Sequence, residues 1–139
     1  TIVAVKEASG DISQVAEILA LSEGRIDLYS GNDDQIVPIV ALGGKGVISV
    51  LSHVLPRETH DMVIKTMSGD ISAGAELQLK YFKLAKALFI EVNPIPVKAA
   101  VNMMGFNAGP LRMPLTEMEE GNKKILRQAM EDAGIKVTE

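Results

Sequence analysis

The sequence predicts an α/β protein with parallel strands, and two observations support this. Short apolar segments rich in β-branched residues recur about every 20 to 25 residues, each followed by a segment whose apolar residues have helical spacing. The chain also has 139 residues, 47% of them hydrophobic and 23% charged, which suits one globular domain. After residue 50 only helical patterns follow. We therefore expect three strand–helix units and then a helical tail.

The charge and residue usage narrow the class of protein. The chain has 14 basic and 18 acidic residues and no Lys/Arg-rich block, which argues against a nucleic-acid surface. It has no cysteine, so disulfides and thiolate metal sites are excluded. No secretory signal or bilayer-spanning apolar run is present, so we expect a cytoplasmic protein without a membrane partner. Because Thr1 stands directly at a strand, we also expect a fragment.

The first unit begins at residues 2–8, an apolar run that is short and rich in β-branched residues and therefore predicts a buried strand. Asp11 is expected to cap the following helix, with Gln14 as its capping-box partner. The apolar stripe of this helix ends near Gly24.

Residues 25–30 (RIDLYS) and 46–50 (GVISV) are the second and third predicted strands, with a short helix between them. The glycine-rich stretch at residues 43–46 resembles a phosphate loop. It ends a helix and enters a strand, however, whereas a phosphate loop follows a strand and opens a helix. We therefore interpret it as a tight turn.

The tail is predicted to be helical throughout. Helices are expected over residues 56–67 and 70–89, and a third follows the turn at residues 93–96 (NPIP). The last helix is expected to start from a capping box at residues 116–119 (TEME) and to stop at Gly134.

Lys6 is the most informative residue because it stands at the C-terminal end of the first predicted strand. Burial disfavours an ammonium ion and lowers its pKa, which is how a lysine becomes a nucleophile for carbonyl carbons. A lysine at a strand end can also simply extend to solvent. In parallel α/β sheets the chemistry gathers at the C-terminal strand ends. The other two strands place residues 30–32 and 48–49 there, so all of these can face one pocket.

Other candidate groups carry less chemistry. Gly31 allows a ligand to approach the backbone, or serves only a turn with φ > 0. Asn32 and the two aspartates after it are expected to cap the next helix, because carboxylates in one loop without a nearby histidine make a poor metal site. His53 and His60 form neither a triad nor a zinc site by themselves.

Five sequence blocks occur in one order: VAVKEASGD around Lys6, YSGND ending at Asp33, GGKGVISV ending at Val50, NPIPVK at 93–98 and LRMPL at 111–115. Together they resemble the C-terminal half of the dihydrodipicolinate synthase (4-hydroxy-tetrahydrodipicolinate synthase) family, within the pyruvate-dependent Schiff-base aldolase and lyase superfamily. The resemblance implies the C-terminal part of a (β/α)₈ TIM barrel. Its last three βα units would occupy residues 1–68 and a C-terminal helical extension residues 69–139.

The resemblance also implies an activity: condensation of pyruvate with L-aspartate semialdehyde to 4-hydroxy-tetrahydrodipicolinate, in diaminopimelate and lysine biosynthesis. Lys6 would form the Schiff base with pyruvate, Ile48 would contact pyruvate through its main chain, and Gly31 and Asn32 would line the pocket. No metal or organic cofactor is implied. A homo-oligomer, dimer or tetramer, is implied too. Ile12, Ser13 and Leu42 match positions near the contact between two dimers of the family tetramer.

The family pattern places further essential groups before Lys6, including a tyrosine of a proton relay that neither Tyr29 nor Tyr81 matches. We therefore expect the isolated chain to be inactive and to require the N-terminal half of the barrel. Two alternatives stay open: a sister enzyme such as N-acetylneuraminate lyase or a keto-deoxy-sugar-acid aldolase, and an inactive α/β interaction module. A nucleotide-binding sheet is disfavoured because no glycine-rich turn follows the first strand.

Overall fold

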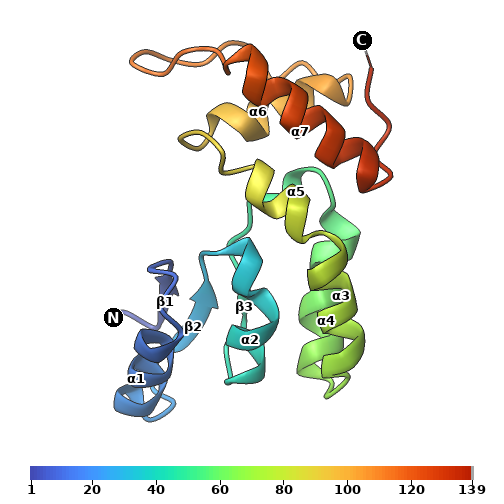
Figure 1. Cartoon of the computed structure of the whole chain (residues 1–139). Coiled ribbons are helices and arrows are strands. Elements are labelled where there is room, and N and C mark those ends of the chain that lie inside the picture. Colours follow the sequence, from blue (N-terminus) through green and yellow to red (C-terminus); the bar gives the residue numbers. More distant parts are fainter. Residues whose placement is uncertain (139) are drawn as a thin grey trace. The chain divides into compact units, whose positions relative to one another are not determined.

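The computed structural model describes residues 1–138, which form one parallel sheet and a series of helices (Figure 1). The sheet has the order β1-β2-β3, with β1 at Ala4–Glu7, β2 at Asp27–Ser30 and β3 at Gly46–Val47. Both strand pairs are parallel. The prediction of an α/β protein with three parallel strands is therefore confirmed.

The chain divides into two compact units. The first contains Thr1–Ser49 and Arg57–Leu79, and the second contains Val50–Pro56 and the chain from Lys80 onward. The predicted boundary between the βα units of the barrel (residues 1–68) and the helical extension (residues 69–139) concerns the complete barrel and stays a prediction. The helices that follow one another through the first unit are α1 (Ile12–Ser22), the 3₁₀ helix η1 (Asp33–Gln35), α2 (Ile36–Ala41), α3 (Pro56–Met67) and α4 (Ile71–Lys80).

Helix α1 is capped as predicted by Asp11, whose Oδ1 accepts hydrogen bonds from the N–H groups of Ser13 at 2.8 Å and Gln14 at 3.4 Å. The capping-box role of Gln14 is wrong. Its Nε2 donates instead to Oε1 of Glu7 at 3.0 Å, while Ser9 Oγ accepts from the N–H of Asp11 at 3.0 Å. The start of α1 is thereby tied to the end of β1.

The core of the first unit lies between the sheet and its helices. Val15 of α1, Leu28 of β2 and Ile39 of α2 are almost completely buried and pack together. The partly buried side chains around them are Val5, Ile18 and Leu19. This packing of apolar helix faces on one face of a sheet is what the predicted stripes required.

Both outer strands differ from the prediction. Only Gly46 and Val47 of the third predicted strand pair as β3, although the N–H of Ile48 still donates to the carbonyl of the neighbouring strand. At the start of the first predicted strand, Ile2 and Val3 are 81% and 68% exposed rather than buried. A strand at the edge of a sheet has a neighbour on one side only, so these apolar residues stay uncovered.

The single helix predicted over residues 70–89 is two helices, α4 and α5 (Phe82–Ala87), interrupted at Tyr81 with ψ of 7°. Helix α4 also buries a polar side chain, Gln78. Its Oε1 accepts from the N–H of Val37 at 3.0 Å, and its Nε2 donates to the carbonyl of Asp33 at 2.7 Å. This buried amide holds the turn from η1 into α2.

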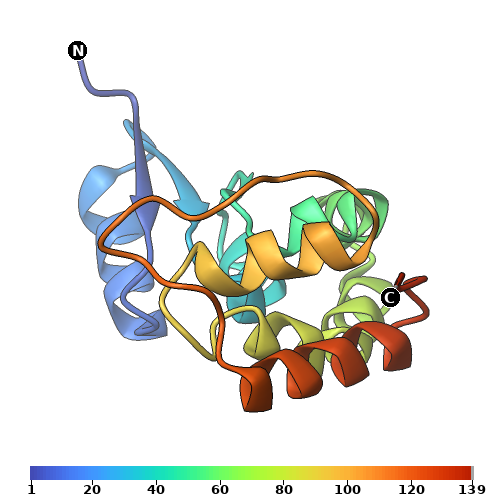
Figure 2. The same cartoon turned by 90° about the horizontal axis from the view of Figure 1, so that it is seen from above.

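The second unit is helical. It contains the 3₁₀ helix η2 (Leu51–His53), α5, α6 (Ile95–Met103) and α7 (Glu120–Asp132), and α7 packs against both α5 and α6 (Figure 2). Its most deeply buried side chains include Leu51 of η2, Leu84 of α5, Leu88 directly after α5, Ala100 of α6, and Leu126 and Met130 of α7.

The capping box predicted for α7 is wrong. Glu119 is the N-cap residue and makes no side-chain cap bond. Oε1 of Glu91 accepts from the N–H of Glu119 at 3.0 Å and from Nδ2 of Asn122 at 2.8 Å, so the helix start is held from another loop. The predicted stop is confirmed, because α7 ends at Asp132 and Gly134 has a φ of +80°. Within residues 1–138, no helix is long and apolar enough to cross a membrane.

Candidate active site

Lys6 lies on the face of the sheet opposite the helix-covered core. It is paired in register with Tyr29 of β2, which is paired with Gly46 of β3. Side chains alternate between faces along a strand, and register partners share a face. Val5 and Leu28, the preceding partners, pack into the core with α1 and α2. The amine of Lys6 is therefore carried on the face that no helix of this core covers.

Gly31 lies against the side chain of Lys6. A Cβ at position 31 would stand 2.8 Å from Cε of Lys6 and 2.5 Å from Cβ of Ala8, and the N–H of Gly31 donates to the carbonyl of Glu7 at 2.6 Å. The φ of Gly31 is not in the left-handed region, unlike that of eight other glycines. The interpretation that it serves a turn with φ > 0 is therefore wrong. Glycine is needed because any side chain would collide with Lys6 and Ala8.

Ile48 follows β3 and is 52% exposed. Its N–H donates to the carbonyl of Ser30 at 2.8 Å, so a main-chain contact between Ile48 and a ligand would have to use its carbonyl oxygen. The C-terminal ends of the three strands thus bring Lys6, Gly31 and Ile48 together at one end of the sheet, as predicted from parallel topology.

Asn32 points elsewhere. Its main chain bonds Ser30 twice: the N–H donates to Oγ at 3.1 Å and the carbonyl accepts from the same hydroxyl at 2.8 Å. Its amide lies beside Gly10, where an added Cβ would be 3.8 Å from Nδ2. Asn32 is the N-cap residue of η1 but makes no side-chain cap bond, so that detail of the prediction is wrong.

Glu7 is a buried acidic residue that the sequence reasoning missed. Lys6 is exposed, but Glu7 is only 4% exposed. Its Oε1 accepts from the N–H of Ser9 at 2.8 Å and from Nε2 of Gln14 at 3.0 Å. The other oxygen, Oε2, is buried without a hydrogen-bond partner among the residues described. The alternation of side chains along a strand could have indicated this burial, because Val5 and Glu7 are two residues apart and therefore share the core-facing side.

The histidines make local contacts. Nδ1 of His53 lies 3.0 Å from the carbonyl of Val50, and Nδ1 of His60 lies 3.3 Å from Oδ1 of Asp61 at the surface. In the part of the chain that the structure describes, no cluster of three or more His, Cys, Asp or Glu side chains could hold a metal ion.

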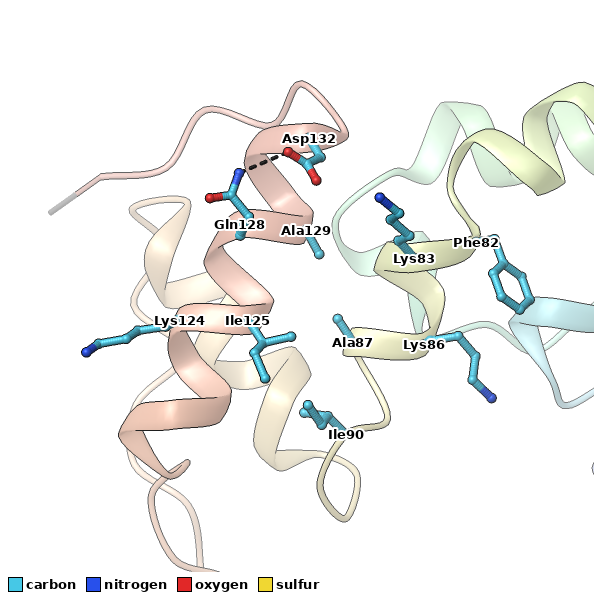
Figure 3. A pocket seen from close by; sticks show the side chains of 10 residues that line it. All are labelled: Phe82, Lys83, Lys86, Ala87, Ile90, Lys124, Ile125, Gln128, Ala129 and Asp132. Carbon is cyan, nitrogen blue, oxygen red and sulfur yellow. Dashed lines mark hydrogen bonds between the residues drawn. The ribbon is translucent and has the colours of Figure 1, made fainter.

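A groove of about 740 Å³ lies within the second unit, between α5 and α7 (Figure 3). Ala87, Ala129, Ile90 and Ile125 face the space between the two helices, whereas Lys86 and Lys124 point away from it. The one carboxylate of the lining, Asp132, accepts a hydrogen bond from the Gln128 amide at 2.9 Å; Phe82 and Lys83 complete the lining. The groove is mainly apolar, so the C-terminal end of the sheet, where Lys6 lies, is the better candidate for an active site.

The fold and the site together define a parallel α/β protein with an amine at a strand end, seated against a glycine of the neighbouring loop. The sequence profile of the Dihydrodipicolinate synthetase family matches residues 1–133, and the chain belongs to that family. The family predicted from the five sequence blocks is therefore confirmed.

Individual relatives agree with this membership. The 4-hydroxy-tetrahydrodipicolinate synthase of Caldicellulosiruptor bescii is 62% identical over 136 residues, which are 98% of this chain and 46% of that protein. The crystal structure of dihydrodipicolinate synthase from Aquifex aeolicus superposes with a TM-score of 0.94 at 37% identity, covering 99% of this chain and 47% of that one.

A third relative was crystallised with a ligand. The chloride-inhibited dihydrodipicolinate synthase from Acinetobacter baumannii, complexed with pyruvate, superposes with a TM-score of 0.92 at 35% identity, covering 96% of this chain and 46% of that one. The chain thus spans about half the length of the relatives it matches.

Proposed function

We propose that this chain provides the Schiff-base lysine of a 4-hydroxy-tetrahydrodipicolinate synthase, a cytoplasmic lyase of diaminopimelate and lysine biosynthesis. The observation that carries the proposal is the position of Lys6 at the end of β1, on the helix-free face and against Gly31. Relatives of that name at up to 62% identity support it. So does the pyruvate complex of the Acinetobacter baumannii relative.

In the proposed reaction the neutral amine of Lys6 attacks the keto carbon of pyruvate, and loss of water leaves an iminium ion. The iminium withdraws electrons, so a proton can leave the methyl group and an enamine forms. The enamine carbon then attacks the aldehyde carbon of L-aspartate semialdehyde, and a new carbon–carbon bond results. Because the iminium is itself the electron sink, the reaction needs no metal or organic cofactor.

The neighbouring strand ends would bind the pyruvate unit. We place the pyruvate unit near the carbonyl of Ile48 and the backbone of Gly31, which lie at the same C-terminal end of the sheet as Lys6. Asn32 would line the pocket through its main chain, because its amide lies beside Gly10.

The complete site requires more polypeptide than this chain. Three strands cannot close an eight-stranded barrel, and the exposed Ile2 and Val3 at the edge of β1 are surfaces that an adjoining strand would cover. We therefore propose that these strands belong to the C-terminal part of a (β/α)₈ barrel. The isolated chain would be inactive, because the groups that bind the substrate carboxylates and relay protons would come from the other half.

A homo-oligomer, dimer or homotetramer, is part of the proposal. Ile12 and Leu42, which match positions near a dimer–dimer contact of the family, are 39% and 48% exposed, and Ser13, the next residue after Ile12 and the third such position, is exposed. Exposed apolar side chains at these positions suit a contact that removes them from water.

Two alternatives use the same residues differently. A sister aldolase would keep Lys6 but accept another aldehyde; the names of the relatives favour the synthase. In an inactive interaction module, Lys6 would have no catalytic role. Lys6 is exposed in this chain, which favours an inactive module only for the isolated fragment.

The test is an intact mass spectrum after incubation with pyruvate and borohydride, which reduces the iminium to a stable amine. We expect one reduced pyruvate on Lys6 of the complete protein and no specific adduct on the isolated chain. The matched control is Lys6→Arg in the complete protein, which should take up no label. An unlabelled wild-type protein, or an adduct on another residue, would contradict the proposal.

A further inference from the structure

Glu7 holds both segments that flank the candidate nucleophile. Through Oε1 it accepts from the N–H of Ser9 at 2.8 Å and from the amide of Gln14 at 3.0 Å, which fixes the turn from β1 into α1. Through its carbonyl it accepts from the N–H of Gly31 at 2.6 Å, which fixes the loop after β2. Lys6 directly precedes Glu7 in β1, and its Cε lies beside Gly31 of this loop.

The position is an unusual one for a carboxylate. Acidic side chains are seldom almost fully buried, because leaving water is costly unless hydrogen bonds compensate. Here Glu7 is 4% exposed, and its Oε2 has no hydrogen-bond partner within residues 1–138. An apolar residue would suit the core-facing side of β1 better, as Val5 does two positions earlier. Hydrophobic packing therefore does not account for Glu7, whereas the two hydrogen bonds that its Oε1 accepts do.

The two segments that Glu7 holds meet beside Lys6, because Gly31 of the loop lies against both Ala8 of the turn and the side chain of Lys6. Gly31, held by the carbonyl of Glu7, is the residue whose added Cβ would stand 2.8 Å from Cε of Lys6. A shift of the turn or of this loop would therefore move the surface on which the lysine rests. A nucleophile misplaced by about 1 Å can lose about a hundredfold in rate.

We propose that Glu7 is a positioning residue for Lys6: its Oε1 and its carbonyl hold the strand end so that the amine meets the keto carbon of pyruvate. The inference rests on the proposed function of Lys6 and goes beyond it by giving the buried carboxylate of Glu7 a positioning role. What matters in this role is the acceptor geometry, not the negative charge.

Two substitutions in the complete protein separate positioning from stability. Glu7→Gln keeps an oxygen at Oε1 for both donors but puts an NH₂ group in place of Oε2, where it is buried without an acceptor, so the unfolding midpoint should fall. Glu7→Ala removes the acceptor altogether. At saturating pyruvate and a temperature at which both variants are folded, we expect borohydride trapping on Lys6 to slow by about 10- to 100-fold in Glu7→Ala. In Glu7→Gln trapping should keep nearly the wild-type rate despite the lower unfolding midpoint.

Glu17→Ala, which removes an exposed carboxylate of α1, is the matched control and should trap at the wild-type rate. If Glu7→Ala traps as fast as wild type, or if Glu7→Gln is as slow as Glu7→Ala, the positioning role is overturned while the wild-type adduct still supports the proposed function. If the wild-type protein itself forms no adduct, the proposed function fails, and the role of Glu7 fails with it.

Discussion

The two compact units of this chain bury their apolar side chains to different degrees. Among residues 1–138, seven of the buried hydrophobic side chains belong to the first unit, which contains the sheet, and fifteen belong to the helical second unit. Largely exposed apolar side chains occur in both units, for example Ile2 at 81% in the first and Met113 at 84% in the second, so the contrast between the units is in their buried cores.

The difference follows from the geometry of the elements. Helices satisfy their own backbone hydrogen bonds, so a few of them can close a core by packing apolar faces together. A parallel sheet needs neighbours on both edges and cover on both faces. We therefore propose that the unit that carries Lys6 is the one that adjoining strands of a complete barrel would cover. Four predictions for the complete protein test whether chemistry and independent stability are divided in this way.

The largest effect is expected from replacing Lys6. Lys6→Ala should lower kcat by at least about a thousandfold, because no other group supplies the covalent step. Lys83→Ala, in the groove between α5 and α7, should leave kcat unchanged. Steady-state kinetics on both variants is the measurement. Comparable losses would mean that the second unit takes part in the chemistry.

The second effect is on the stability of the helical unit. Leu126 of α7 is fully buried, whereas its neighbour Ile125 is 52% exposed. Leu126→Ala should destabilise the protein by about 2–5 kcal/mol, the usual range for creating a cavity. Ile125→Ala should lower the free energy of unfolding far less, because that side chain is already half in water. Urea denaturation would measure both, and equal losses would contradict the packing described for α7.

The third effect concerns Gly31. Gly31→Ala places a Cβ 2.5 Å from Cβ of Ala8 and 2.8 Å from Cε of Lys6, so the lysine or the loop must move. We expect a loss of about a hundredfold in the rate of pyruvate trapping. Gly24→Ala is the control: Gly24 has a φ of +75° but no atom within 4 Å of the added Cβ. That variant should lose some stability and keep its trapping rate.

The smallest effect is electrostatic. Nζ of Lys123 lies 2.7 Å from Oε1 of Glu120, and this hydrogen bond lowers the pKa of Glu120 and raises the pKa of Lys123. A lowered carboxyl pKa stabilises the fold above the ordinary value of 4.5 and ceases to do so as the pH falls through the folded-state value. The raised pKa of Lys123 stabilises below 10.5 and is lost as the pH rises through its folded-state value.

Because Glu120 is exposed, water and salt screen the pair. Glu120→Gln should therefore lower the unfolding midpoint only slightly at neutral pH, and the difference from wild type should vanish in strong acid and shrink in high salt. Thermal unfolding across pH and ionic strength would show this. A large shift that persists in high salt would contradict it.

The parts of the site that the sequence predicted depend on local pattern and on topology. Parallel strands have their C-terminal ends on the same side of the sheet, so the sequence alone predicts that Lys6, Gly31 and Ile48 lie together. The reason for Gly31 could not be predicted, because it depends on how closely Lys6 and Ala8 approach the loop. The burial of Glu7 was missed for a similar reason: its acceptor role needs α1 packed against the end of β1.

The errors in the helices also have tertiary causes. The apolar stripe of residues 70–89 continues across Tyr81, so periodicity cannot reveal a break of one residue. Both proposed capping boxes failed because the side chains or backbone groups concerned have partners elsewhere in the fold. Gln14 binds Glu7, and the N–H of Glu119 binds Glu91.

The buried amide of Gln78 has a consequence for the order in which the protein forms. Its partners Val37 and Asp33 are 41 and 45 residues earlier in the chain, and closing so long a loop costs conformational entropy before the contact forms. During synthesis, the segment after β2 cannot gain this contact until residue 78 has left the ribosome. The turn from η1 into α2, which follows the loop that carries Gly31 and Asn32, therefore gains these two hydrogen bonds only after most of α4 has been made.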